Sequence, residues 1–131
     1  MMDKIKILVV EDDESVAELC TCTLQEAGYE VTTAANGIEA LERLRDRRYD
    51  LILSDIRMPV LDGIGLKLRA VTEFPYLNNR FVFMSASLNH EAHSFFLRTK
   101  TRCIAKPFLI KELINEVEWQ LRAVLDTQLP N

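Results

Sequence analysis

Four apolar runs in this sequence each end at a side chain that can take part in polar chemistry. In chain order they are residues 5–10 followed by Glu11 and Asp12, residues 51–53 followed by Asp55, residues 81–84 followed by Ser85, and residues 103–105 followed by Lys106. If the runs are neighbouring parallel strands, their carboxyl ends meet at one edge of a sheet. Acids, a hydroxyl and an amine would then share a single site.

The three acids at this edge cannot all stay ionised without a partner. Two carboxylates about 4 Å apart repel by roughly 4 kcal/mol at an effective dielectric near 20. Glu11, Asp12 and Asp55 must therefore take up protons or share a divalent cation. Oxygen ligands favour magnesium, calcium or manganese, and a site with few protein ligands and several waters suits magnesium.

A cation, Lys106 and Ser85 gathered around Asp55 indicate phosphoryl transfer. The carboxylate would be the nucleophile, while the cation and the ammonium neutralise the oxygens of the transferring group. The product, an aspartyl phosphate, adds local charge that can draw a loop toward it. Each residue alone has an ordinary structural explanation, and Asp13 is expected to cap a helix. Four strand ends that each supply a fitting group favour a site.

The elements that must position these residues alternate along the chain. Apolar runs predict strands at 5–10, 49–54, 80–84 and 103–105, and a shorter, more polar edge strand is expected at 30–34. Spacing predicts helices at 14–27, from 36, from about 64, at 88–97 and from 107. Leu19, Ile38, Leu68 and Ile110 are among the residues expected on the inner helix faces. Five strands alternating with five helices predict an α/β fold with a parallel sheet covered on both sides.

Composition narrows the class of protein further. The chain has 131 residues, of which 48% are hydrophobic, and a net charge of −4. We expect one domain over 1–126, with 127–131 as a tail or the start of a linker. The mild negative charge argues against direct nucleic-acid binding. No apolar stretch approaches the roughly 20 residues of a membrane span. No signal peptide is visible, and the three cysteines lack metal-ligand spacing, so we expect reduced thiols in the cytoplasm.

The sequence resembles the receiver domain of two-component response regulators from residue 4 to about 125. The residues that carry the resemblance are Ile7 to Asp13, Ser54 to Pro59 with Asp62-Gly63, Ser85-Ala86, and Lys106-Pro107-Phe108. Together, and in this order, these motifs are highly specific. The resemblance implies a flavodoxin-like doubly wound fold with strand order 2-1-3-4-5.

The resemblance also implies a role for each residue at the edge. Asp55 would be phosphorylated, with Mg²⁺ held by Asp12, Asp55, the backbone carbonyl of Arg57 and, mostly through water, Glu11. Ser85 and Lys106 would bind the phosphoryl group, helped by Ala86 and Arg57. The peptide bond before Pro107 would be cis. Such a domain is no conventional enzyme, although it promotes its own phosphorylation and, slowly, its own dephosphorylation.

The partners implied are equally specific. The phosphodonor would be a phosphohistidine on a sensor histidine kinase or a histidine phosphotransfer protein. Phosphorylation would shift a two-state equilibrium, through Ser85 and Cys103, on a surface made by the fourth helix, fifth strand and fifth helix. That surface would contact a downstream protein or a second copy of the chain. Trp119 is a candidate for it, and burial of Trp119 is an equal alternative.

One departure keeps other hypotheses open. Receivers usually carry an aromatic residue three positions before the lysine, and Cys103 has no ring to turn inward. A receiver-like interaction module that signals without phosphorylation is therefore an alternative, and its binding would ignore magnesium and Asp55. A phosphatase with an aspartyl intermediate is a third hypothesis. Such enzymes usually place a second acid two residues after the nucleophile, where this chain has Arg57.

Overall fold

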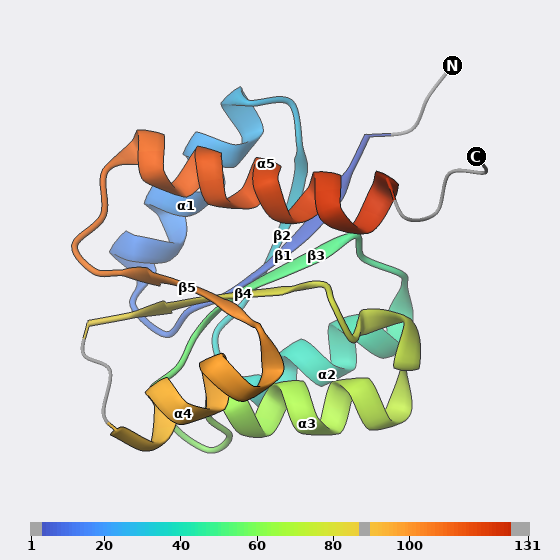
Figure 1. Cartoon of the computed structure of the whole chain (residues 1–131). Coiled ribbons are helices and arrows are strands. Elements are labelled where there is room, and N and C mark those ends of the chain that lie inside the picture. The colour runs from blue at the N-terminus through green and yellow to red at the C-terminus, as the bar shows by residue number, and fades with distance from the viewer. Residues whose placement is uncertain (1–3, 87–89, 127–131) are drawn as a thin grey trace.

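A computed structural model of the protein describes residues 4–86 and 90–126, and within them strands and helices alternate (Figure 1). The strands are β1 (Lys6–Val10), β2 (Glu30–Ala34), β3 (Leu51–Asp55), β4 (Phe81–Ser85) and β5 (Arg102–Ala105). The helices are α1 (Glu14–Glu26), α2 (Gly37–Asp46), α3 (Gly63–Glu73), α4 (His90–Thr99) and α5 (Ile110–Asp126), with a short 3-10 turn, η1, at Pro75–Leu77.

The five strands form one parallel sheet in the order β2-β1-β3-β4-β5. This confirms the predicted fold class and strand order. The central pairs place Val10 opposite Ser54 and Asp55 opposite Met84. The strand order reverses between β1 and β3, where the two neighbouring connections leave toward opposite faces, and such a reversal is where ligands sit in open α/β sheets.

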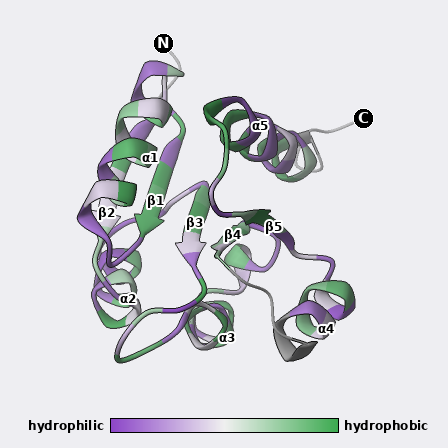
Figure 2. Cartoon of the chain, turned by 90° about the vertical axis from the view of Figure 1, so that its left-hand side faces the viewer, coloured by the Kyte–Doolittle hydropathy of each residue, from purple (hydrophilic) through white to green (hydrophobic). Residues whose placement is uncertain are grey.

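Side chains alternate across the sheet and feed two separate cores. Leu8 and Val10 of β1 point into the core beneath α2, α3 and α4, whereas Ile7 and Val9 point into the core beneath α1 and α5. Figures 1 and 2 show these two helix layers on opposite sides of the strands. Because β1, β3 and β4 are buried on both faces, their sequences are nearly continuous apolar runs.

Helix caps fix where the chain leaves the sheet. Asp13 accepts the backbone N–H of Ser15 at 2.9 Å and so caps α1, as predicted. Asn36 accepts the N–H of Glu39 at 2.9 Å, while the Glu39 carboxylate accepts the N–H of Ala35 at 3.1 Å, and the two bonds form a variant of the capping box at the start of α2. Gly28 follows α1 with φ of 101°, the left-handed conformation expected there.

Several details of the predicted helix faces are wrong. Leu19, Ile38, Leu68 and Ile110 were expected inside but are exposed. Each lies at the margin of an apolar stripe whose centre is taken by other residues, such as Cys20 and Leu24 in α1. The last helix begins at Ile110 rather than Pro107. Residues 88 and 89, at the start of the predicted fourth helix, lie outside the described part of the chain. No helix in the described part could cross a membrane.

Candidate acidic site at the sheet edge

The carboxyl ends of β1, β3, β4 and β5 converge as the sequence predicts. Glu11 follows β1, Asp55 ends β3, Ser85 ends β4 and Lys106 follows β5. Backbone hydrogen bonds keep these ends in register, with the N–H of Ile56 donating to the carbonyl of Met84 and the N–H of Lys106 donating to that of Ser85. The candidate residues from four different strands therefore lie along one edge.

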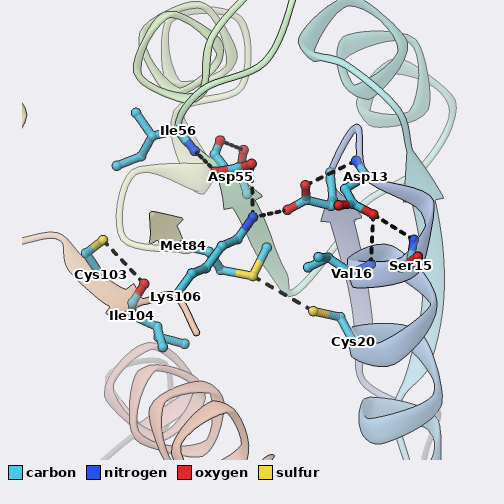
Figure 3. Close-up of polar contacts among 12 residues, drawn as sticks. Asp13, Ser15, Val16, Cys20, Asp55, Ile56, Met84, Cys103, Ile104 and Lys106 are labelled. Carbon is cyan, nitrogen blue, oxygen red and sulfur yellow. Dashed lines mark hydrogen bonds and ion pairs between the residues drawn. The ribbon is translucent and has the colours of Figure 1, made fainter. Parts of the chain in front are cut away.

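Lys106 joins the two buried acids of this edge. Its ammonium Nζ lies 2.8 Å from Glu11 Oε2 and 3.1 Å from Asp55 Oδ2, and it donates to both (Figure 3). Glu11 is 3% exposed, and Asp55 is also buried. A charge-assisted pair of this kind tolerates burial because the ammonium supplies the hydrogen bonds that water otherwise would. The peptide bond between Lys106 and Pro107 is cis, as the resemblance implies.

Backbone contacts hold the Asp55 carboxylate in place. Its Oδ1 accepts the N–H of Ile56 at 2.8 Å, and the carbonyl of Ile56 in turn accepts the N–H of Gly63 at 2.7 Å. A Cβ on Gly63 would lie 2.3 Å from the carbonyl oxygen of Asp55, so only glycine permits this approach. The start of α3 is thus packed directly on the backbone of Asp55.

Asp12 completes a cluster that suits a hard cation. Carboxylate oxygens of Glu11, Asp12 and Asp55 lie within 4.8 Å of one another, and Asp12 is exposed to solvent. All three donors are oxygens, and the open side at Asp12 leaves room for the waters that magnesium retains. The residues present therefore fit Mg²⁺, with Asp12, Asp55 and Glu11 as the side chains that would hold it.

Burial and charge at this edge shift the pKa values of Glu11 and Lys106. Burial raises the pKa of the Glu11 carboxyl, and the hydrogen bond from Lys106 counteracts only part of that rise. Burial acts to lower the pKa of the Lys106 ammonium, but its bonds to Glu11 and Asp55 outweigh that effect and the net shift is upward. Lys106 is therefore a permanent cation at neutral pH.

The remaining predicted residues surround this cluster. Ser85 is buried at the end of β4, whereas Ala86 and Arg57 are exposed at the rim. Cys103 is half-buried on β5, and burial raises the pKa of its thiol to about 11. Trp119 is exposed on α5, with the Arg102 guanidinium 4.1 Å from its ring centroid, so the buried alternative is wrong. Arg102 is also paired with Glu116.

Two contributors escape sequence reasoning. The Ile56 amide that binds Asp55 Oδ1 has no signature, because any residue after the aspartate supplies the same N–H. Asp62 accepts the N–H of Gly65 at 2.7 Å and so caps α3, although the Asp62-Gly63 pair predicts only a turn. The available signal was the residue type, because aspartate is a preferred N-cap and Asp62 directly precedes the expected helix.

Fold and site together define a class: a doubly wound α/β domain with an acid–lysine site at its topological switch point. The family model described as response regulator receiver domain matches residues 7–118. The chain therefore belongs to the response regulator receiver domain family. Such domains carry signals in two-component systems, in contact with histidine kinases or phosphotransfer proteins, and are not conventional enzymes. They generally bind Mg²⁺ at an acidic pocket.

Individual relatives agree with this assignment. The response regulator receiver protein CpdR of Brucella abortus is 37% identical over 120 residues, which cover 90% of this chain and 98% of that protein. The chain also matches the CpxR homolog of Haemophilus influenzae, a transcriptional regulatory protein, at 36% identity over 121 residues, but spans only 50% of its length. The chain thus matches nearly the whole of one relative and about half of the other.

Solved structures of response regulators have the same fold. TrrA of Thermotoga maritima, in complex with Mg²⁺ and BeF, is 30% identical and has a TM-score of 0.77, covering 88% of this chain and 98% of that one. The CheY-like receiver domain protein of Methanospirillum hungatei is 25% identical with a TM-score of 0.88, covering 95% and 99%.

Proposed function

We propose that the protein is a phosphoacceptor that takes a phosphoryl group from a phosphohistidine onto Asp55 in a magnesium-dependent reaction. The observation that carries this proposal is the position of Lys106, whose ammonium bridges Glu11 and Asp55 at 2.8 and 3.1 Å. An incoming phosphoryl group could replace the Glu11 contact or share it, so the cation needed to neutralise its oxygens is already at the nucleophile.

Each side chain has a defined part in the proposed reaction. Mg²⁺ would be held by Asp12, Asp55, Glu11 and the carbonyl of Arg57. When bound, it would neutralise the negative charge of the phosphoryl oxygens. Ile56 N–H fixes Asp55 Oδ1, which leaves Oδ2, the oxygen that faces Lys106, for attack on phosphorus. Ser85, at the end of β4, and Ala86 would contact the transferred group.

The proposed transfer balances without a further reactant. A bond forms between Asp55 Oδ2 and phosphorus while the bond between phosphorus and the histidine nitrogen of the donor breaks. The electron pair of that bond returns to the imidazole, which takes a proton from solvent. Lys106 stays protonated throughout and acts only as a charge, consistent with the upward shift of its pKa beside Glu11 and Asp55.

The donor needs a surface beside Asp55. An apolar hollow of about 320 Å³ adjoins the site and is lined by Val16, Leu19, Ala86, Lys106, Pro107 and Phe108. Its walls come from α1, from Ala86 after β4 and from the segment after β5. Leu19 is exposed and is not part of the buried core beneath α1. An exposed apolar side chain at this hollow supports contact with the sensor kinase or phosphotransfer protein.

Output is proposed to pass through α4, β5 and α5. Cys103 on β5 cannot supply the ring movement of an aromatic residue, so coupling would rest on Ser85 and on the exposed Trp119 face, which would meet a downstream protein or a second copy of the chain. Arg57 is exposed at the mouth of the site and is long enough to cover a phosphoryl group. We therefore expect slow autodephosphorylation, measurable by chasing the phosphoprotein in excess magnesium.

The decisive experiment is labelling with acetyl phosphate and magnesium. Wild type should gain one phosphoryl group that hydroxylamine removes, as it removes any acyl phosphate, and Asp55→Asn should gain none. Asp50→Asn is the matched control, because Asp50 lies just before the opposite end of β3 and accepts the N–H of Lys6. Equal labelling of wild type and Asp55→Asn would overturn the assignment of Asp55.

The alternative, an interaction module without phosphorylation, gives the opposite pattern. Its only specific support is Cys103 in place of an aromatic residue. It predicts no labelling of wild type, together with partner binding that neither chelation of magnesium nor Asp55→Asn changes. The phosphatase hypothesis requires turnover of a small phosphate ester, and the exposed Arg57 offers no general acid.

A further inference from the structure

A second cation is buried in the protein, away from the chemistry of Asp55. Lys67, in the middle of α3, is only 7% exposed. Within the described residues its single hydrogen bond runs from Nζ to Thr101 Oγ1 at 2.7 Å, and no acidic side chain forms an ion pair with it. The Phe95 ring centroid lies 5.7 Å from Nζ, at the limit of a weak cation–π contact. A buried charge with so little compensation calls for an explanation.

The hydroxyls beside Lys67 form a chain of hydrogen bonds that takes up one of its three N–H groups. Thr99 Oγ1 donates to the carbonyl of Phe95 at 2.8 Å and lies 2.6 Å from Thr101 Oγ1. Each hydroxyl has one proton. Since the Thr99 proton is directed to Phe95, Thr101 must donate to Thr99 and accept from Lys67. The chain of bonds thus runs one way, and two of the three ammonium protons stay unused within the described part of the molecule.

Lys67 lines a cavity of suitable size and character for a small ligand. The cavity has a volume of about 300 Å³ and lies where α3 faces α4. Leu68, Val71 and Phe95 give it apolar walls, and Asn78 and Asn79 add amide groups at one side. Ligand pockets are typically apolar with a few polar groups that fix orientation, and they start at about 300 Å³.

We propose that this groove between α3 and α4 binds a small organic monocarboxylate. Its carboxylate accepts the two unused protons of Lys67, and its apolar body lies against Leu68, Val71 and Phe95. One cation in the cavity selects a single negative charge, and apolar walls select an organic ion over an inorganic one. Burial lowers the pKa of the Lys67 ammonium, and a bound carboxylate counteracts that penalty. The proposal does not depend on phosphorylation of Asp55.

The test is a titration of the full chain with benzoate, followed by NMR without magnesium. Amide resonances of Lys67, Phe95 and Thr101 should shift and saturate with benzoate. Benzamide, which has the same ring and no charge, should leave them unchanged. Lys67→Met keeps an unbranched side chain that is one atom shorter, and it should bind benzoate at least about tenfold more weakly, the loss expected for a hydrogen bond to a charged group. Lys111→Met, which removes an exposed lysine on α5, should bind like wild type.

Two results would overturn the proposal. One is equal binding of benzoate by Lys67→Met and wild type, and the other is equal binding of benzamide and benzoate. If Lys67→Met does not fold, wild type alone still decides. The Cε–Hε resonance of Lys67 must then move with benzoate and stay fixed with benzamide. A resonance that ignores benzoate excludes contact with the ammonium and therefore the site.

Discussion

Lys106 and Glu11 form the shorter of the two ion pairs that Lys106 makes at the acidic edge, with Nζ 2.8 Å from Oε2. The Glu11 side chain is 1% exposed, so the Lys106 ammonium and the N–H of Asp13 take the place of the water that this carboxylate would otherwise bind. Lys106 thus also contributes to the stability of the folded state before any phosphoryl group arrives. Catalytic and structural effects of changing it must be measured separately.

Lys106→Met should destabilise the protein by about 3 kcal/mol in the presence of EDTA, because removing one partner leaves a buried carboxylate unpaired. Thermal unfolding with and without magnesium measures this. Magnesium should recover part of the loss, since a cation that binds the folded state restores positive charge beside Glu11 and Asp55. Lys111→Met serves as the control at an exposed position. A melting temperature equal to wild type in EDTA would show that Glu11 does not depend on Lys106.

Asp12 and Asp13 are adjacent in sequence but should differ in what they do. Asp12→Asn removes an exposed metal-site carboxylate, and we expect magnesium affinity to fall by at least about tenfold with little change in stability. Asp13→Ala removes the cap of α1 and should cost about 1 kcal/mol while leaving magnesium affinity intact. Calorimetric titration with Mg²⁺ and denaturant unfolding of both variants separate the two effects. The reverse pattern would exchange their assigned roles.

The sheet and its edge were predictable because burial on both faces leaves little freedom in sequence. The strands β1, β3 and β4 admit hardly any polar residue before their carboxyl ends, so Glu11, Asp55 and Ser85 stand out directly after apolar runs. Each such residue alone could be structural, but fitting groups at four strand ends favour a site. The parallel arrangement then brings the ends together without further information.

Helix surfaces were less predictable because their burial depends on the neighbouring element. Lys67 would be expected at the surface, yet Phe95 and Thr101 from α4 and the segment after it enclose it. Leu68, one position along, is exposed instead. Helical spacing restricts which residues share a face, but it does not fix how wide the contact with a second helix becomes.

The loop after β3 contains a strained residue whose effect on stability can be measured. Val60 has φ of 73°, and the N–H of Leu61 donates to the carbonyl of Pro59 at 2.8 Å, so Val60 is the centre of a three-residue γ-turn. A β-branched residue is unfavourable there, and Val60 is 81% exposed, so no packing compensates. Val60→Gly should stabilise the protein by about 1 kcal/mol.

Val60→Ala is the control for that gain. It removes the exposed side chain but keeps a Cβ, so most of the strain stays and stability should change by less than for glycine. Denaturant unfolding of the two variants gives the comparison. Equal stabilisation by alanine and glycine would assign the effect to loss of exposed apolar surface instead of to the backbone.

Gly63 and Gly65 lie in the first turn of α3 and allow the packing against Asp55 to be tested. A Cβ on Gly63 would lie 2.3 Å from the backbone oxygen of Asp55, which cannot move without displacing the carboxylate. A Cβ on Gly65 would meet Leu61 Cδ1 at 2.9 Å, the end of a flexible side chain that can turn aside. Alanine at either position gains about 1 kcal/mol of helix propensity.

Gly63→Ala should nevertheless destabilise the protein by about 2 kcal/mol or more, as overpacking does in a core, and it should slow labelling by acetyl phosphate. Gly65→Ala should be close to wild type in both measurements, and a Gly63→Ala variant that is equally unaffected would mean that α3 does not support the phosphorylation site.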